Sequence, residues 1–183
     1  MSSPLLVIFF WGGIDGPWNV ERISEVTGAT LPIVPRVRVF EGGQVDVGEG
    51  AWRLRGVTSN ERYVERAERT LLVERQPTLG RDAASCAALI PISKSAAWWE
   101  LPQDERRKVL EERSRHIAVG LEYLPTVARR LHHGRDLGEE FDFVTWFEYP
   151  PEASTAFEDL VKRLRSTEEW LYVEREVDIR LRR

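Results

Sequence analysis

The chain has 183 residues, of which 42% are hydrophobic, enough to bury a core as one compact domain or as two small fused ones. It carries 26 Lys and Arg against 30 Asp and Glu, a net charge of −4. This balance argues against a nucleic-acid-binding protein, which would normally show a basic excess. It also repels anions at long range, so an anionic substrate would have to be attracted by a few well-placed cations.

Cysteine content and the N-terminal residues bear on the cellular compartment. The one cysteine, Cys86, cannot form an internal disulfide, and we expect it to be a small buried apolar residue. The N-terminal apolar run follows no basic region and precedes no small-residue cleavage site, so a signal peptide is not expected. No run is long enough to span a membrane. We therefore expect a cytoplasmic protein.

Short strands and helices are predicted for most of the first part of the chain. We expect a strand at 5–11, a short helical stretch near 18–26, strands near 34–40 and 51–57, and a helix near 60–74. The segment 75–85 is expected to be a linker. Apolar residues at 86–93 then predict a strand, in which Pro91 favours an edge or a strand end.

The second part of the chain is easier to interpret. Apolar residues at helical spacing predict an amphipathic helix from Gln103 to about Leu121. Strands are expected at 126–133 and 141–149, joined by a turn at 134–138. A helix from Pro150 to about Leu164 follows, and alternation at 169–181 predicts a final strand.

The order strand, helix, strand, strand, helix, strand is typical of a ferredoxin-like unit. The first part fits the same order, although no sequence repeat supports a duplication. We therefore predict an α+β protein in which two ferredoxin-like halves, 1–75 and 86–183, form an α+β barrel of the type called a dimeric α+β barrel.

Three histidines are weighed as ligand candidates. His132 and His133 lie near a turn and are interpreted as surface or edge residues. His116 lies late in the predicted amphipathic helix, and Gly120, one turn on, would let a flat ligand approach the backbone. An isolated histidine there is more often structural. A haem iron, however, needs an imidazole held on a rigid element, and His116 meets that requirement.

Strand alternation predicts which charged side chains point inward. Arg129 shares a face with Val127 and Leu131, whereas Arg130 lies on the other face. The same count turns Glu169 inward and Glu168 outward, and Lys94 shares a face with two isoleucines. A buried charge is costly unless it is paired, so each could form a structural ion pair. Three inward charges in one small domain favour a lined pocket.

Trp98 and Trp99 follow Lys94 by four and five residues. Core or interface packing is the commoner role for tryptophan, although a Trp-Trp pair beside a cation also suits a large aromatic cofactor. Zinc spacing, a P-loop, a dinucleotide fingerprint and a nucleophile elbow are all missing from the sequence, so it gives no support to a serine or cysteine hydrolase.

From about residue 86 to its end, the chain resembles the chlorite dismutase family. Residues 1–55 match poorly apart from Trp11–Gly13, and the overall length is similar to the shorter branch of the family, whose members form homodimers. The stretches that carry the resemblance are Ala88–Glu100, Tyr123–Arg130, Arg135–Gly138, Phe141–Tyr149 and Thr167–Glu176, with Arg62–Glu68 in the first half.

The resemblance implies a role for individual residues. His116 would be the proximal ligand of a haem b iron, and Glu169 would accept its other N–H. Arg129 would be the distal arginine, and Gln76 matches a distal glutamine that hydrogen-bonds this arginine in some short members. The residues that match the lining of the haem edge and propionates are Lys94, Trp98 and Tyr63.

The resemblance also implies an activity, the conversion of chlorite into chloride and dioxygen, with Arg129 attracting the anion and confining the reactive fragment. Coproheme decarboxylases share the fold and the proximal histidine but lack the distal arginine, so Arg129 and the short length argue against them. A dye-decolourising peroxidase would need a distal aspartate in a motif that the sequence lacks. A haem-binding protein without turnover remains the alternative from another class.

Overall fold

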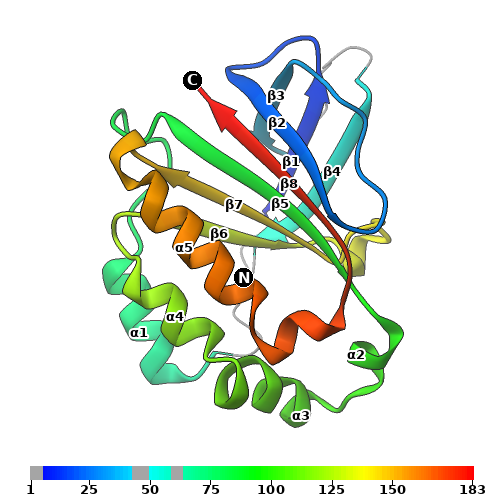
Figure 1. Ribbon diagram of the computed structural model, residues 1–183, viewed down its shortest axis with the longest axis vertical. Coiled ribbons are helices and arrows are strands. Elements are labelled where there is room, and N and C mark those ends of the chain that lie inside the picture. The colour runs from blue at the N-terminus through cyan, green and yellow to red at the C-terminus, as the bar shows by residue number, and fades with distance from the viewer. Residues whose placement is uncertain (1–5, 43–49, 59–63) are drawn as a thin grey trace, which may run out of the picture.

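The computed structural model describes residues 6–42, 50–58 and 64–183, and these fold into a closed antiparallel barrel flanked by helices (Figure 1). Around the barrel the strands follow the order β1-β3-β2-β8-β5-β7-β6-β4, and each neighbouring pair is antiparallel. The strands are β1 (Val7–Gly13), β2 (Trp18–Thr27), β3 (Arg36–Glu41), β4 (Trp52–Thr58), β5 (Cys86–Lys94), β6 (Ala128–His133), β7 (Phe143–Tyr149) and β8 (Val173–Arg182).

The two parts of the chain contribute their strands in the same spatial order. The first four lie as β2-β3-β1-β4, and the last four repeat this arrangement as β6-β7-β5-β8. The two sets join where β4 pairs with β6 and where β2 pairs with β8. The predicted α+β class and the barrel are therefore confirmed, whereas the division into halves at 75–85 stays a prediction.

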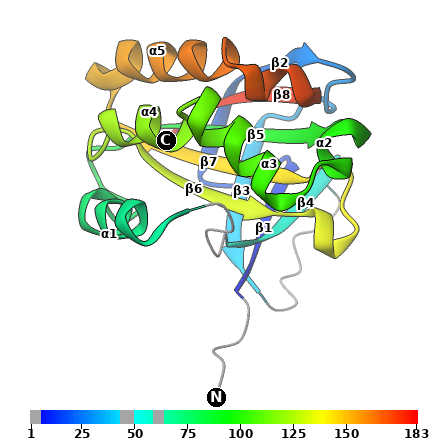
Figure 2. The same cartoon turned by 90° about the horizontal axis from the view of Figure 1, so that it is seen from below.

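The helices lie together on one side of this barrel (Figures 1 and 2). They are α1 (Arg66–Arg75), α2 (Ala96–Glu100), α3 (Gln103–Arg107), α4 (His116–Glu122) and α5 (Ser154–Arg165). The apolar face of α5 packs Phe157, Leu160, Val161 and Leu164 onto the outer face of the sheet. Within the described ranges, none of the helices has the length and hydropathy to cross a membrane.

Strand β5 is buried at every position because both of its faces are covered. Ala87 and Leu89 belong to the core inside the barrel, whereas Ala88, Ile90 and Ile92 pack under the helices. The strand lies between β7 and β8, so the prediction that Pro91 marks an edge or a strand end is wrong. Residues 90 and 91 have no paired residue on β8, so Pro91, which has no amide hydrogen, fits in the strand without breaking this pairing.

The predicted helical stretch near 18–26 is also wrong, because these residues form β2. Val20 pairs with Leu181 and Ile23 with Ile179 of β8, which places both against the barrel core. β-branched residues fit such a half-buried pleated surface better than a helix. The first part of the chain therefore turns from β1 into β2 through residues 14–17 without a helix.

His132 and His133 are buried, which corrects their interpretation as surface or edge residues. The strand that carries them, β6, pairs with both β4 and β7 and so has no free edge. The ring of His132 packs edge-on against Phe10 of the barrel core, with centroids 5.2 Å apart. Burial, with smaller contributions from the charges of Arg130 and His133, lowers the pKa of His132 from 6.5 to about 4.

We predict that His132 makes the fold less stable in mild acid. Between about pH 6.5 and pH 4 the unfolded chain binds a proton at residue 132 that the folded chain excludes, so the free energy of unfolding falls as the pH falls. The full effect is about 3 kcal/mol. Urea titrations at the two ends of this window should show a smaller acid loss in His132→Gln. An equal loss in both proteins would contradict the prediction.

Candidate functional site

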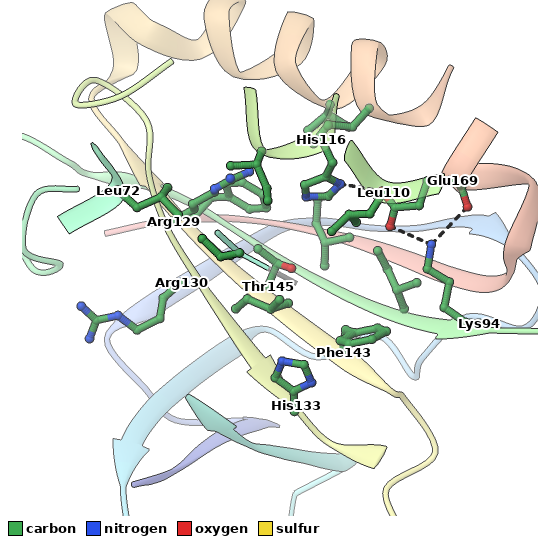
Figure 3. A pocket seen from close by; sticks show the side chains of 18 of the residues that line it. Leu72, Lys94, Leu110, His116, Arg129, Arg130, His133, Phe143, Thr145 and Glu169 are labelled. Carbon is green, nitrogen blue, oxygen red and sulfur yellow. Dashed lines mark hydrogen bonds and ion pairs between the residues drawn. The ribbon is translucent and has the colours of Figure 1, made fainter. Parts of the chain in front are cut away.

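A cavity of about 410 Å³ lies between the helices and the outer face of β5, β6 and β7 (Figure 3). Its volume is within the range of small-molecule and cofactor pockets. The wall is largely apolar, and a few charged side chains reach into it. The apolar lining includes Leu72, Ile90, Ile92, Leu110, Ile117, Leu131, Phe143, Phe147, Val161 and Leu164, and the polar lining includes Gln76, Lys94, His116, Arg129 and Glu169.

His116 is the first residue of α4, because the predicted helix from Gln103 to Leu121 is broken. After α3, residues 108–113 form a π-helical turn, and Arg115 adopts a left-handed conformation with φ of 52°. The carboxylate of Glu111 then accepts hydrogen bonds from the backbone N–H groups of Ile117 and Ala118. The break turns the imidazole into the cavity at a fixed point.

A buried carboxylate joins His116 to Lys94. Nδ1 of His116 lies 2.6 Å from Oε2 of Glu169, and Nζ of Lys94 donates to Oε1 of the same carboxylate at 2.8 Å (Figure 3). Burial by itself raises the pKa of Glu169, but the charges and hydrogen bonds of His116 and Lys94 outweigh it and lower this pKa to about 2. The carboxylate is therefore ionised, and it fixes the ring so that Nε2 remains for a ligand.

Glu169 is inward as predicted, but strand alternation is not the reason. Residues 168–172 form a 3₁₀ turn, and β8 begins only at Val173. Leu171 lies two residues further on, where alternation would place it on the same face as Glu169, but it has 84% of its surface exposed. The turn is held where the backbone N–H of Glu169 donates to Oγ of Ser114, a contact that sequence reasoning missed.

Trp98 lies where the cofactor-lining prediction placed it, in the wall of the cavity beside Lys94. Its side chain is buried, and the ammonium of Lys94 lies 4.7 Å from its ring centroid. On its other side the same ammonium lies 5.4 Å from the ring of Trp170. Two indoles therefore enclose the Lys94–Glu169 ion pair, which strengthens it by keeping water out.

Arg129 extends from β6 across the cavity toward the helix that carries His116 (Figure 3). A Cβ atom added at Gly120 would lie 2.3 Å from the guanidinium carbon, so the guanidinium rests where only glycine leaves room. Among the described residues no carboxylate forms a salt bridge with Arg129. Burial lowers the pKa of this guanidinium, while the charges of Glu169 and Glu111 raise it. Arg130 points away from His116 (Figure 3).

The remaining predicted residues have different outcomes. Gln76 follows α1 and lines the cavity, but its Nε2 is buried without a hydrogen-bond partner in the described part of the chain. Among the described residues no hydrogen bond joins Gln76 to Arg129, and the distal role of Gln76 stays a prediction. Tyr63 lies outside the described residues. His133, which sequence reasoning left aside, lines the cavity on the same face of β6 as Arg129.

This geometry defines a class of protein. An imidazole fixed through Nδ1 by a buried carboxylate, with Nε2 facing an apolar cavity, has the chemistry of an axial metal ligand. An arginine from the sheet reaches into the same space and can attract an anion. The protein is thus an α+β barrel whose largely apolar cavity brings a carboxylate-held imidazole and a cationic side chain together.

Comparison with known proteins identifies the family. The family model of chlorite dismutase matches residues 41–182, and the chain belongs to this family. The dimeric chlorite dismutase of Nitrobacter winogradskyi is 54% identical, with a TM-score of 0.89 over 96% of this chain and 99% of that one.

More distant relatives share the same description. A variant of the chlorite dismutase of Candidatus Nitrospira defluvii is 28% identical, with a TM-score of 0.59, over 80% of this chain and 56% of that one. The chlorite dismutase of Ideonella dechloratans is 38% identical over 71 residues, which are 39% of this chain and only 24% of that protein.

We predict that removing the Glu169 charge alone destabilises the fold. In Glu169→Leu the buried ammonium of Lys94 loses its counter-ion, which typically costs about 3–5 kcal/mol. The double variant Lys94→Met/Glu169→Leu removes both charges and should recover most of this loss. Urea denaturation of the starting protein, the single variant and the double variant measures their free energies of unfolding. A single variant as stable as the starting protein would show that the ion pair does not stabilise the fold.

Proposed function

We propose that the protein binds haem b through His116 and converts chlorite into chloride and dioxygen. One observation carries the proposal: an imidazole held by a buried carboxylate faces a largely apolar cavity that an arginine shares. The chlorite dismutases of N. winogradskyi and I. dechloratans support the choice of reaction.

The residues present fit a haem. Nε2 of His116 is the ring nitrogen that Glu169 leaves unbound, so it is suited to an axial ligand of the iron. The apolar lining suits the porphyrin faces, and the buried amide of Gln76 has no other hydrogen-bond partner in the described residues. When bound, the haem iron would supply the redox chemistry of the reaction.

Each polar residue would then have a distinct task. Glu169, ionised and anchored by Lys94, would accept the Nδ1–H of His116 and increase the electron donation of the imidazole. Arg129 would draw chlorite into a protein whose net charge of −4 repels anions. Its guanidinium would also hold the anion in place while the reaction proceeds, which is a confining role without proton transfer.

Assembly and compartment extend the same proposal. We infer a homodimer, because the N. winogradskyi relative that covers nearly the whole chain is described as dimeric. We also propose that the protein acts in the cytoplasm, in keeping with a single cysteine that cannot form an internal disulfide.

His116→Ala is predicted to lower haem affinity by at least about 100-fold, because loss of a partner behind a ligand already costs 10- to 100-fold. Titration of the haem-free protein with haem, followed by the Soret band, measures this. The matched control is His133→Gln, which removes an imidazole from the same cavity and should keep the spectrum. An unaltered spectrum in His116→Ala would refute His116 as the ligand.

Arg129→Ala is predicted to lower kcat/KM for chlorite roughly 10- to 100-fold, the size of a lost hydrogen bond to a charged group. It should also lose its Soret band after fewer turnovers, because the reactive fragment of the anion would no longer be confined. Oxygen release measured with an electrode tests both effects, and Arg130→Ala, on the opposite face of β6, serves as the control.

Two outcomes would contradict parts of this proposal. A Soret band without oxygen release would favour a haem carrier or a decarboxylase of haem synthesis. If Arg129→Ala changed neither the rate nor the total number of turnovers, the confining role would be wrong.

A further inference from the structure

Trp170 lies against the face of the His116 imidazole. It follows Glu169 in the 3₁₀ turn, and the two rings are nearly parallel, with centroids 6.3 Å apart and 15° between their planes. Its indole also lies within 5.4 Å of the Lys94 ammonium. Trp170 therefore neighbours both groups that bind the Glu169 carboxylate.

The indole is itself held by a second buried carboxylate. Its Nε1–H donates to Oε2 of Glu176 at 2.8 Å, and the Glu176 side chain is fully buried. The other oxygen of Glu176 accepts two hydrogen bonds from Arg165, at 2.9 and 2.6 Å. Arg165 also donates to Asp178 at 2.9 Å. A carboxylate fixed from both sides leaves the indole little freedom to rotate.

We propose that Trp170, anchored by Glu176, is a positioning residue that fixes the plane of the His116 imidazole. The ring of His116 can rotate about its own side-chain bonds, and its hydrogen bond to Glu169 fixes only one edge. The indole, nearly parallel to the imidazole and offset from it, restricts rotation out of that plane. This inference rests on the proposed haem ligation by His116.

The plane matters because the Nδ1–H···Glu169 hydrogen bond depends on alignment. Such a bond weakens steeply as its angle departs from linearity. A weaker bond leaves the imidazole less anionic and a poorer electron donor to the iron. The Trp170–Glu176 pair would therefore set the strength of the iron–histidine bond without contacting either the iron or the substrate.

Trp170→Phe tests this role, because phenylalanine keeps an aromatic ring but cannot bind Glu176. In the haem-loaded protein we expect the iron–histidine stretching band of the ferrous form, recorded by resonance Raman, to broaden and fall in frequency. We also expect the preference for ferric iron to weaken roughly tenfold, which raises the one-electron potential by about 59 mV.

The barrel core offers a matched control. Trp146 donates its Nε1–H to Oε1 of Glu148 at 2.9 Å, the same chemistry as in the Trp170–Glu176 pair, but its side chain lies in the barrel core, away from the cavity. Trp146→Phe should destabilise the fold and leave the Raman band in place. Glu176→Gln tests the anchor, because its single oxygen cannot accept from both Arg165 and the indole N–H on opposite sides, so we expect a shift in the same direction as in Trp170→Phe.

The outcomes separate this inference from the proposed function. If the starting protein shows no iron–histidine band, haem ligation by His116 fails. If the band is present and Trp170→Phe leaves its frequency, width and potential unchanged, Trp170 has no positioning role. Equal shifts in Trp170→Phe and Trp146→Phe would show only a general loosening of the fold and would overturn the inference. A Glu176→Gln protein whose band is unshifted would contradict the anchoring role of Glu176.

Discussion

The Glu169 carboxylate is the constraint on which the site depends. An ionised carboxylate is costly to bury, and here its two oxygens are bound by His116 and Lys94. The carboxylate and its two partners come from three separate segments: the turn before β8, the start of α4 and the end of β5. Because the charge must be matched, the three segments are fixed relative to one another, and the imidazole is fixed with them.

The broken helix follows from the same constraint. A continuous helix through Ser114 and Arg115 would carry the imidazole in whatever direction the helical period dictates. The π-helical turn and the left-handed Arg115 instead restart the helix at His116. Ser114, left at the break, holds the backbone of Glu169 in return. An irregular backbone at this point is therefore part of the ligand's support.

Sequence reasoning succeeded where the local geometry is regular. Arg129 was separated from Arg130 by alternation, and β6 is a true strand, so the argument was sound. Glu169 was selected by the same rule in a 3₁₀ turn, where the rule does not apply, as the exposed Leu171 shows. The helix break was not visible, because apolar spacing continues across it, and the stacking of Trp170 on His116 depends on that unseen turn.

Lys94 and Arg129 both place a positive charge at the cavity, but their surroundings differ. Lys94 is neutralised by Glu169 and enclosed by indoles, so its charge serves the histidine side of the cavity. Arg129 has no salt-bridge partner in the described residues and rests on Gly120. Under the proposed function, the histidine that holds the iron must be rigid, whereas the arginine that attracts the anion must keep its charge available. Pairing Lys94 and leaving Arg129 unpaired would meet both needs.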